Sequence, residues 1–158
     1  VGANNTYKLK CDEDVEFFIN TKDDNIYITR ELYEFERDTN ELVELALQKG
    51  FNPKTQMWCD SAEPDRILMW EKAGWWAEGV DKGGSAGSVK AQIDWLKQRK
   101  IYVHPSCVNT IKELQQWKWK KDEKTGEYLD EPVPFQDDAM AALRYSTEGW
   151  RKYQKWDY

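Results

Sequence analysis

The chain has 158 residues, of which 40% are hydrophobic and 33% are charged, and its formal net charge is −6. This composition excludes intrinsic disorder, and no apolar run approaches the ~20 residues that a membrane-spanning helix needs. A chain near 150 residues buries roughly 70% of the surface that its unfolded form exposes, so we expect one compact domain over residues 1–158. The negative charge opposes tight, static binding to phosphates, although a carboxylate-rich cation site would also contribute to it.

The first residues, Val1 to Asn5, contain neither an initiator Met nor a signal peptide, which predicts a piece of a longer polypeptide. Cys11, Cys59 and Cys107 are odd in number and widely separated, which argues against a disulfide framework or a zinc ribbon. We therefore expect the protein to work in a reducing cytoplasm. Most of the nine tryptophans are expected in the core, although some could stack on bases or sugars.

The first third of the chain predicts a β-hairpin followed by a helix. Residues 15–19 and 26–29 are rich in β-branched and aromatic side chains and flank a polar turn at 23–25. Thr39 is the expected N-cap of a helix that ends at Gly50, because glycine tolerates the left-handed conformation that follows many helices.

The middle of the chain predicts alternating strands and helices. A short strand at 56–59 leads into a helix with Ser61 as its cap and Pro64 in its first turn. A strand-like stretch at 75–77 and a glycine-rich loop at 81–87 precede a helix whose face carries Val89, Ile93 and Leu96.

The last third predicts one more strand and helix, a hairpin and a final helix. Residues 101–104 are expected to form a strand, and Ser106 to cap the helix after it. Residues 117–120 alternate apolar and basic side chains and return through 128–129, as in a β-hairpin standing off the domain with a basic turn side. Strands followed by strand–helix alternation indicate an α/β fold with a mixed sheet.

Asp60 is the first candidate for a functional site, because it comes directly after a predicted strand. In sheets of this kind ligands bind outside the carboxyl ends of strands. An equally good interpretation from local sequence is that Asp60 only caps the next helix.

Asp137 and Asp138 are the second candidates and stand at the start of the last predicted helix. Capping and the helix dipole favour one carboxylate there, and two exceed what one cap needs. Carboxylate oxygens are natural ligands of Mg²⁺ and Mn²⁺, so a strand-end Asp facing this pair predicts a metal site.

Other chemistry finds less support. The glycine loop lacks the Walker pattern, so this chain should not hydrolyse ATP, although Lys82 and Lys90 beside the loop could contact a DNA phosphate. His104 is the only histidine, which excludes a His-rich zinc site and favours a structural hydrogen bond for this residue.

Four segments together resemble the C-terminal nuclease domain of tailed-bacteriophage terminase large subunits: CDSAEP at 59–64, KGGSAGSVK at 82–90, VHPSCVNTI at 103–111 and DDAMAALRY at 137–145. The resemblance implies an RNase H-like fold, a central mixed β-sheet flanked by helices with a protruding hairpin. It also implies a Mg²⁺- or Mn²⁺-dependent endonuclease that cuts concatemeric viral DNA in the host cytoplasm during phage assembly. Implied partners are double-stranded DNA, an ATPase motor domain of the same polypeptide, the small terminase subunit and the portal protein.

Three acids carry the family's site, which implies that Asp60 is the second and that Asp138 with Asp137 supplies the third, holding two ions. Many relatives read Asn-His-Ala-Ile-Asp-Ala-Leu-Arg-Tyr at the last helix, so Asp138 stands in place of His, and Ala141 in place of Asp. The Gly-x-Asp-x-Gly motif of the first acid is absent. The weak candidates for that acid are Asn4, Asp12 and Asp14.

Two alternatives to a nuclease remain open at this stage. A non-catalytic DNA-guiding module would use the hairpin lysines Lys118, Lys120, Lys121 and Lys124 on phosphates beside a vestigial metal site. A Trp-rich carbohydrate-binding module is the other alternative, and the strand–helix alternation counts against it.

Overall fold

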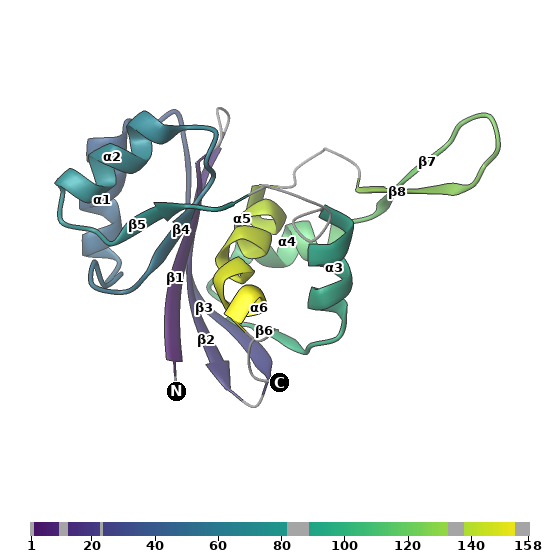
Figure 1. The fold of residues 1–158 in the computed structure, drawn as a ribbon, viewed down its shortest axis with the longest axis horizontal. Helices are drawn as coiled ribbons and strands as arrows, with labels where there is room; N and C mark the ends of the chain where they lie inside the picture. The colour runs from purple at the N-terminus through teal and green to yellow at the C-terminus, as the bar shows by residue number, and fades with distance from the viewer. Residues whose placement is uncertain (1, 10–12, 23, 82–88, 133–137, 154–158) are drawn as a thin grey trace.

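The computed structural model describes residues 2–9, 13–22, 24–81, 89–132 and 138–153. Six strands form one sheet in the order β5-β4-β1-β2-β3-β6, and two more form a separate hairpin that projects from the body (Figure 1). The strands of the sheet are β1 (Gly2–Leu9), β2 (Glu13–Lys22), β3 (Asn25–Phe35), β4 (Met57–Cys59), β5 (Ala77–Gly79) and β6 (Ile101–Val103). The hairpin strands are β7 (Trp119–Lys121) and β8 (Tyr128–Pro132).

The helices are α1 (Thr39–Gln48), α2 (Pro64–Lys72), α3 (Val89–Lys97), α4 (Val108–Gln116), α5 (Asp138–Ser146) and α6 (Glu148–Tyr153). Strands β1, β2 and β3 pair antiparallel, whereas β4, β5 and β6 add parallel pairings. This confirms the predicted mixed α/β sheet and both predicted hairpins. Within the described residues, no helix combines the length and apolarity needed to cross a bilayer.

Strand β1 was not predicted, although it occupies the centre of the sheet between β4 and β2. Its sequence, GANNTYKL, alternates apolar and polar residues only at its end, Tyr7-Lys8-Leu9, and carries two consecutive asparagines, which strands disfavour. Its pairing with β2 on one side and β4 on the other overrides that weak local preference.

Strand β3 contains an irregularity that decides which side chains face which helices. Phe18 of β2 pairs with Arg30, but the next residue, Ile19, pairs with Ile28, so β3 has one extra residue at Thr29. Such a bulge changes the alternation of faces along the strand. Ile28, before the bulge, and Glu31, after it, both face the side of the sheet covered by α4 and α5. Leu32 faces the other side and joins the core beneath α1 and α2.

The two faces of the sheet carry separate cores. Helices α1 and α2 cover one face, where the buried core contains Leu42, Met57, Cys59 and Trp70. The other helices lie on the opposite face, where Ile26, Leu96, Met140 and Leu143 are buried together (Figure 1). Trp70 and Trp75 are core residues as expected for most tryptophans, whereas Trp76 is exposed.

Three of the predicted helix caps were wrong. Asp38, not Thr39, caps α1 and forms a reciprocal capping box with Glu41. Neither Ser61 nor Ser106 caps its helix: α2 begins after Glu63, and α4 begins after Cys107. The predictions of Pro64 in the first turn of α2 and of Gly50 in a left-handed conformation after α1 are confirmed.

The last predicted helix is two helices, α5 and α6, which meet at Ser146 and Thr147. The hydroxyls of both residues donate to the Leu143 carbonyl oxygen, and such bonds compete with the helical backbone pattern. Helix α6 is then held by a buried ion pair between Glu148 and Arg151. A Cβ on Gly149 would lie 2.6 Å from the Trp58 ring, so only glycine lets α6 approach β4 this closely.

Candidate active site

Asp60 lies immediately after β4, which pairs in parallel with the central strand β1. Its Oδ1 atom accepts a hydrogen bond of 2.9 Å from the Ala62 backbone N–H, which fixes the turn between β4 and α2. The predicted position at the carboxyl end of a strand is therefore confirmed. The alternative that Asp60 caps α2 is wrong, because its hydrogen bond to Ala62 lies in the turn ahead of that helix.

The position facing this end of β4 is occupied by Ala141 of α5. Met57 and Cys59 point into the core beneath α1 and α2, so alternation directs Trp58 to the other face of the sheet. There Trp58 packs against a buried cluster of Val80, Ala141 and Tyr145. The residue that replaces the family's later Asp thus contributes a methyl group to an apolar cluster beside the strand that ends at Asp60.

Asp138 lies in the first turn of α5 and is only 6% exposed. Helix α5 packs across β1, β2 and β4, and its first-turn residues Ala139 and Met140 are buried in the core that contains Ile26 and Ile28 of β3. Asp137 lies outside the described residues. The structure thus describes one member of the predicted acid pair, and it is buried.

Glu113 of α4 stands next to Asp138 and was not predicted as part of the site. Its Oε2 accepts a 3.1 Å hydrogen bond from the Met140 backbone N–H, and its Oε1 accepts one of 2.9 Å from the Tyr33 hydroxyl. Burial raises the pKa of Glu113 to about 7, the Asp138 charge adds to the rise, and the hydrogen bonds oppose it. No sequence signal distinguished Glu113 from the other charged residues of its helix.

Glu31 of β3 caps α4 in a similar way. Its two carboxylate oxygens accept four hydrogen bonds from Asn109 and Thr110, at 2.6 to 3.2 Å. This explains why Ser106 is not the cap. The Ser106 hydroxyl instead lies 2.7 Å from His104 Nδ1, which confirms the structural role predicted for that histidine.

The donors present match the chemistry of a hard divalent cation only in part. Asp60 and Asp138 offer carboxylate oxygens, which Mg²⁺ and Mn²⁺ prefer. Within the described parts of the chain, however, three or more His, Cys, Asp or Glu side chains do not gather into a metal-binding group. In donor type, therefore, Asp60 and Asp138 fit a cation, and Ala141 supplies no ligand.

The first family acid can be located only through the backbone. Asn5 of β1 is opposite Met57 in the parallel register, so Asn4 lies one step earlier on the strand next to β4. The pairs Asn5–Met57 and Thr6–Trp58 run toward Asp60, so Asn4 lies on the amino-terminal side of β4, away from Asp60. Asp14, the second residue of β2, pairs with Leu9 at the carboxyl end of β1, which is the Asp60 edge of the sheet, but it lies one strand further from β4. Asp12 lies outside the described residues.

The predicted DNA-binding lysines form one group on the hairpin and a separate residue on α3. Lys118, Lys120, Lys121 and Lys124 are all exposed on the projecting hairpin or at its base. Lys90 is exposed on α3 and forms a 2.8 Å ion pair with Asp94, which partly balances its charge. Lys82 lies outside the described residues.

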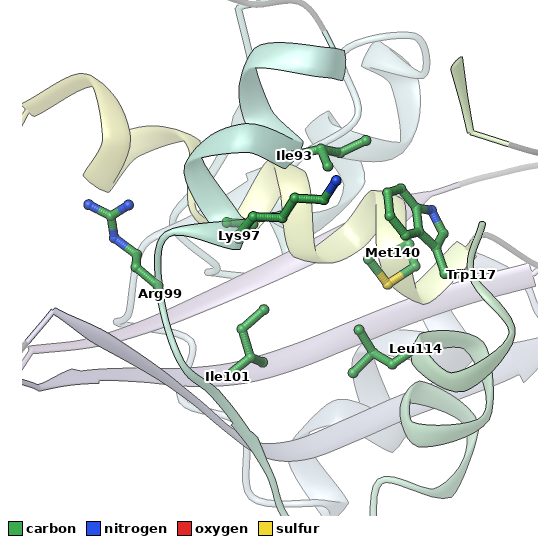
Figure 2. Close-up of a pocket in the computed structure, with 8 residues that line it drawn as sticks. Ile93, Lys97, Arg99, Ile101, Leu114, Trp117 and Met140 are labelled. Carbon is green, nitrogen blue, oxygen red and sulfur yellow. The ribbon is translucent and has the colours of Figure 1, made fainter. Parts of the chain in front are cut away.

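The base of the hairpin is attached to α3 through a lysine and two tryptophans. Lys97 Nζ lies 4.7 Å from the Trp119 ring centroid and 5.9 Å from that of Trp117, within the range of cation–π attraction. Figure 2 shows the Lys97 side chain extending toward Trp117. Both residues line a cavity of about 250 Å³. Its lining is mostly apolar and includes no residue of β4, so this cavity is separate from Asp60.

Comparison with known proteins identifies relatives by sequence model and by structure. Residues 13–148 match the family model described as the terminase RNase H-like domain. The fold is similar to the large terminase nuclease domain of bacteriophage SPP1 with bound Mn, with a TM-score of 0.79 and 19% identity over 93% of this chain and 84% of that one. No curated protein sequence matches the chain.

Two further structures have similar folds. The large terminase nuclease domain of P22 gives a TM-score of 0.72 at 16% identity, covering 94% of this chain and 81% of that one. A large terminase from a thermophilic bacteriophage, solved in complex with ADP, gives 0.70 at 16% identity, covering 91% of this chain but only 39% of that one. At these identities the structures establish the RNase H-like fold.

Replacing Glu113 with Gln should flatten the pH dependence of stability between pH 4.5 and 7. The folded-state pKa of Glu113 is raised from 4.5 to about 7, so its contribution to stability is full below pH 4.5 and is lost as the pH rises through 7. The expected loss in the wild type is about 3 kcal/mol, measured by urea unfolding across this range. Glu123→Gln on the hairpin turn is the control, and an unchanged profile in Glu113→Gln would contradict the assignment.

Proposed function

The chain belongs to the family of terminase RNase H-like domains, and from that premise we propose that it cuts concatemeric double-stranded viral DNA during genome packaging. The reaction is hydrolysis of a phosphodiester bond within the duplex, dependent on Mg²⁺ or Mn²⁺. The observation that carries the proposal is the position of Asp60 at the carboxyl end of β4. This strand lies next to the central strand β1, and α5 crosses both of them.

The residues assigned to the cation site are Asp60, Asp137 and Asp138. A pair of bound divalent cations would supply an activated water and charge stabilisation for the leaving oxygen of the phosphodiester. The protein's own contribution is to fix carboxylates in position. The Asp60 side chain is held by its bond to Ala62, and the first turn of α5, which carries Asp138, is held by the bond from Met140 to Glu113.

The proposed partners follow from the same assignment. Duplex viral DNA is the substrate, and an ATPase motor domain of the same polypeptide would deliver it. The chain covers only 39% of the longer large terminase solved with ADP, which is consistent with such an additional region. The small terminase subunit and the portal protein are the other proposed partners, and the host cytoplasm is the proposed compartment.

A second candidate function is favoured by one specific observation, the buried methyl group of Ala141. Ala141 is 3% exposed and packs with Trp58, Val80 and Tyr145, where many relatives carry an acid. A site without that acid would hold cations weakly. In this alternative the domain guides DNA through the hairpin lysines and does not cut it.

Asp60→Asn and Asp138→Asn should each reduce plasmid nicking and linearisation by roughly a hundredfold or more, since each removes the charge of a proposed ligand. The assay follows supercoiled plasmid in Mn²⁺ or Mg²⁺ on agarose gels, with Asp65→Asn on the exposed start of α2 as the control. Cleavage that persists in both variants and in EDTA would eliminate the metal-dependent mechanism.

Ala141→Asp distinguishes the two candidate functions. If the site is vestigial for want of this acid, the substitution should create cleavage absent from the wild type and make thermal stability rise with added MnCl₂. Ala141→Asn has nearly the same size and polarity without the charge, and it should do neither. A wild type that already cuts at full rate, with no gain in Ala141→Asp, argues against a vestigial site.

Lys120→Ala with Lys124→Ala should weaken duplex DNA binding at low salt and reduce the dependence of log K on log salt. Removing one lysine–phosphate interaction lowers the slope by about 1, because fewer counterions are released on binding. Fluorescence anisotropy with labelled duplex DNA at several salt concentrations measures both quantities. Lys54→Ala, on the loop after α1, is the matched control, and equal slopes in the wild type and the hairpin variant would remove the hairpin from the DNA-binding surface.

A further inference from the structure

The amino-terminus of α5 takes a cap from another helix. Met140 is the third residue of α5, and its backbone N–H is one of those that lack a partner within the helix. Glu113 Oε2 accepts that hydrogen at 3.1 Å, from a side chain that is 3% exposed. The first turn of α5 is therefore held against α4 by this carboxylate.

Glu113 is itself held on its second oxygen. The Tyr33 hydroxyl, from β3, donates to Oε1 at 2.9 Å. One carboxylate thus joins β3, α4 and the start of α5. Because its two oxygens have separate partners, rotation of the carboxylate would break at least one hydrogen bond.

From this geometry we propose that Glu113 is a positioning residue for the cation site, setting the place of Asp138 through the first turn of α5. The inference rests on the proposed function, because it assigns Asp138 as a cation ligand. Glu113 itself need not contact the cation or the DNA. It acts through Met140, two residues along the helix from Asp138.

Stability alone gives a weaker reason for a carboxylate at this position. A buried carboxylate beside the carboxyl of Asp138 is costly to ionise, and apolar replacements of buried charged groups are often neutral or stabilising. Glutamate provides something that an apolar side chain would not, an acceptor pointing at the α5 amides and a second acceptor for Tyr33. Both bonds orient the turn that carries Asp138.

Glu31 offers an internal control for this proposal. It too is a buried glutamate that accepts hydrogen bonds from the first turn of a helix, with Thr110 N–H at 2.9 Å. Its helix, α4, carries none of the three acids assigned to the cation site. Loss of Glu31 should therefore affect folding without a selective effect on the cation.

The experiment compares Glu113→Leu and Glu113→Gln with Glu31→Leu, using Mn²⁺ alone as the probe. Mn²⁺ affinity is measured by isothermal titration at a temperature where circular dichroism shows each variant folded. Glu113→Leu should bind Mn²⁺ about tenfold more weakly than the wild type. Glu113→Gln keeps an oxygen acceptor and should recover the affinity to within about threefold, while Glu31→Leu should match the wild type.

Two further measurements keep the proposal decidable. If Glu113→Leu does not fold, Tyr33→Phe removes the hydroxyl that donates to Glu113 and should still weaken Mn²⁺ binding. If Glu31→Leu does not fold, Thr110→Val replaces it as the control. Amide hydrogen exchange should show faster exchange of Ala139 and Met140 in Glu113→Leu, restored protection in Glu113→Gln, and no change in the control.

The outcomes separate this proposal from the proposed function. Equal Mn²⁺ affinity in folded Glu113→Leu and the wild type, or equal losses in the Glu31 control, would overturn the positioning role. A wild type that binds no Mn²⁺ would instead count against the cation-dependent nuclease. Amide exchange would then test whether Glu113 orders the first turn of α5. Unchanged protection of the Ala139 and Met140 amides in Glu113→Leu overturns this role, and loss of their protection in Glu113→Leu but not in the Glu31 control supports it.

Discussion

The hydrogen bond from the Met140 backbone N–H to Glu113 places the first turn of α5, and a second buried glutamate, Glu31, holds the first turn of α4 in the same way. Glu31 projects from β3 and accepts the first-turn hydrogen bonds of α4, and Glu113 projects from α4 and accepts that of α5. Each glutamate comes from a distant part of the sequence. Cys107, which precedes α4, makes no side-chain cap, and the residue that precedes α5 lies outside the described residues. The first turn of α5 is therefore held directly by Glu113 of α4, whose second oxygen is bonded to Tyr33 of β3.

This arrangement brings α5 to the candidate site with an unusual choice of side chains. The helix presents Ala141 to the apolar cluster at Trp58 and keeps Asp138 one turn earlier, buried beside Glu113. Asp60, by contrast, lies where a strand-end acid is expected and is held by its own turn. The chain thus has the fold of the terminase RNase H-like family, with a buried methyl group at Ala141 on the helix that carries Asp138.

The elements with regular patterns were predictable from sequence, and those fixed by distant contacts were not. The hairpin from β2 to β3, the helix bearing Ile93 and Leu96, and the strand-end place of Asp60 followed from local periodicity. Strand β1 was missed because only its last three residues alternate, and its pairing with β2 and β4 specifies it. Glu31 and Glu113 were missed for the same reason: their helix partners lie 79 and 27 positions away, and no local signal marks a capping residue at that distance.

The extra residue of β3 gives the chain one place where its length can change without disturbing the cores. Thr29 falls between the pairs Ile19–Ile28 and Phe18–Arg30, so deleting it alone would leave the strand in a regular register. Ile26, Ile28 and Glu31 would keep their faces, because the alternation already runs from Ile28 through Arg30 to Glu31. A further one-residue insertion between Ile28 and Glu31, without a second bulge, would instead put the two isoleucines and the carboxylate on opposite faces of the sheet. An alignment of relatives should therefore tolerate a one-residue gap at Thr29 and not an added residue beside it.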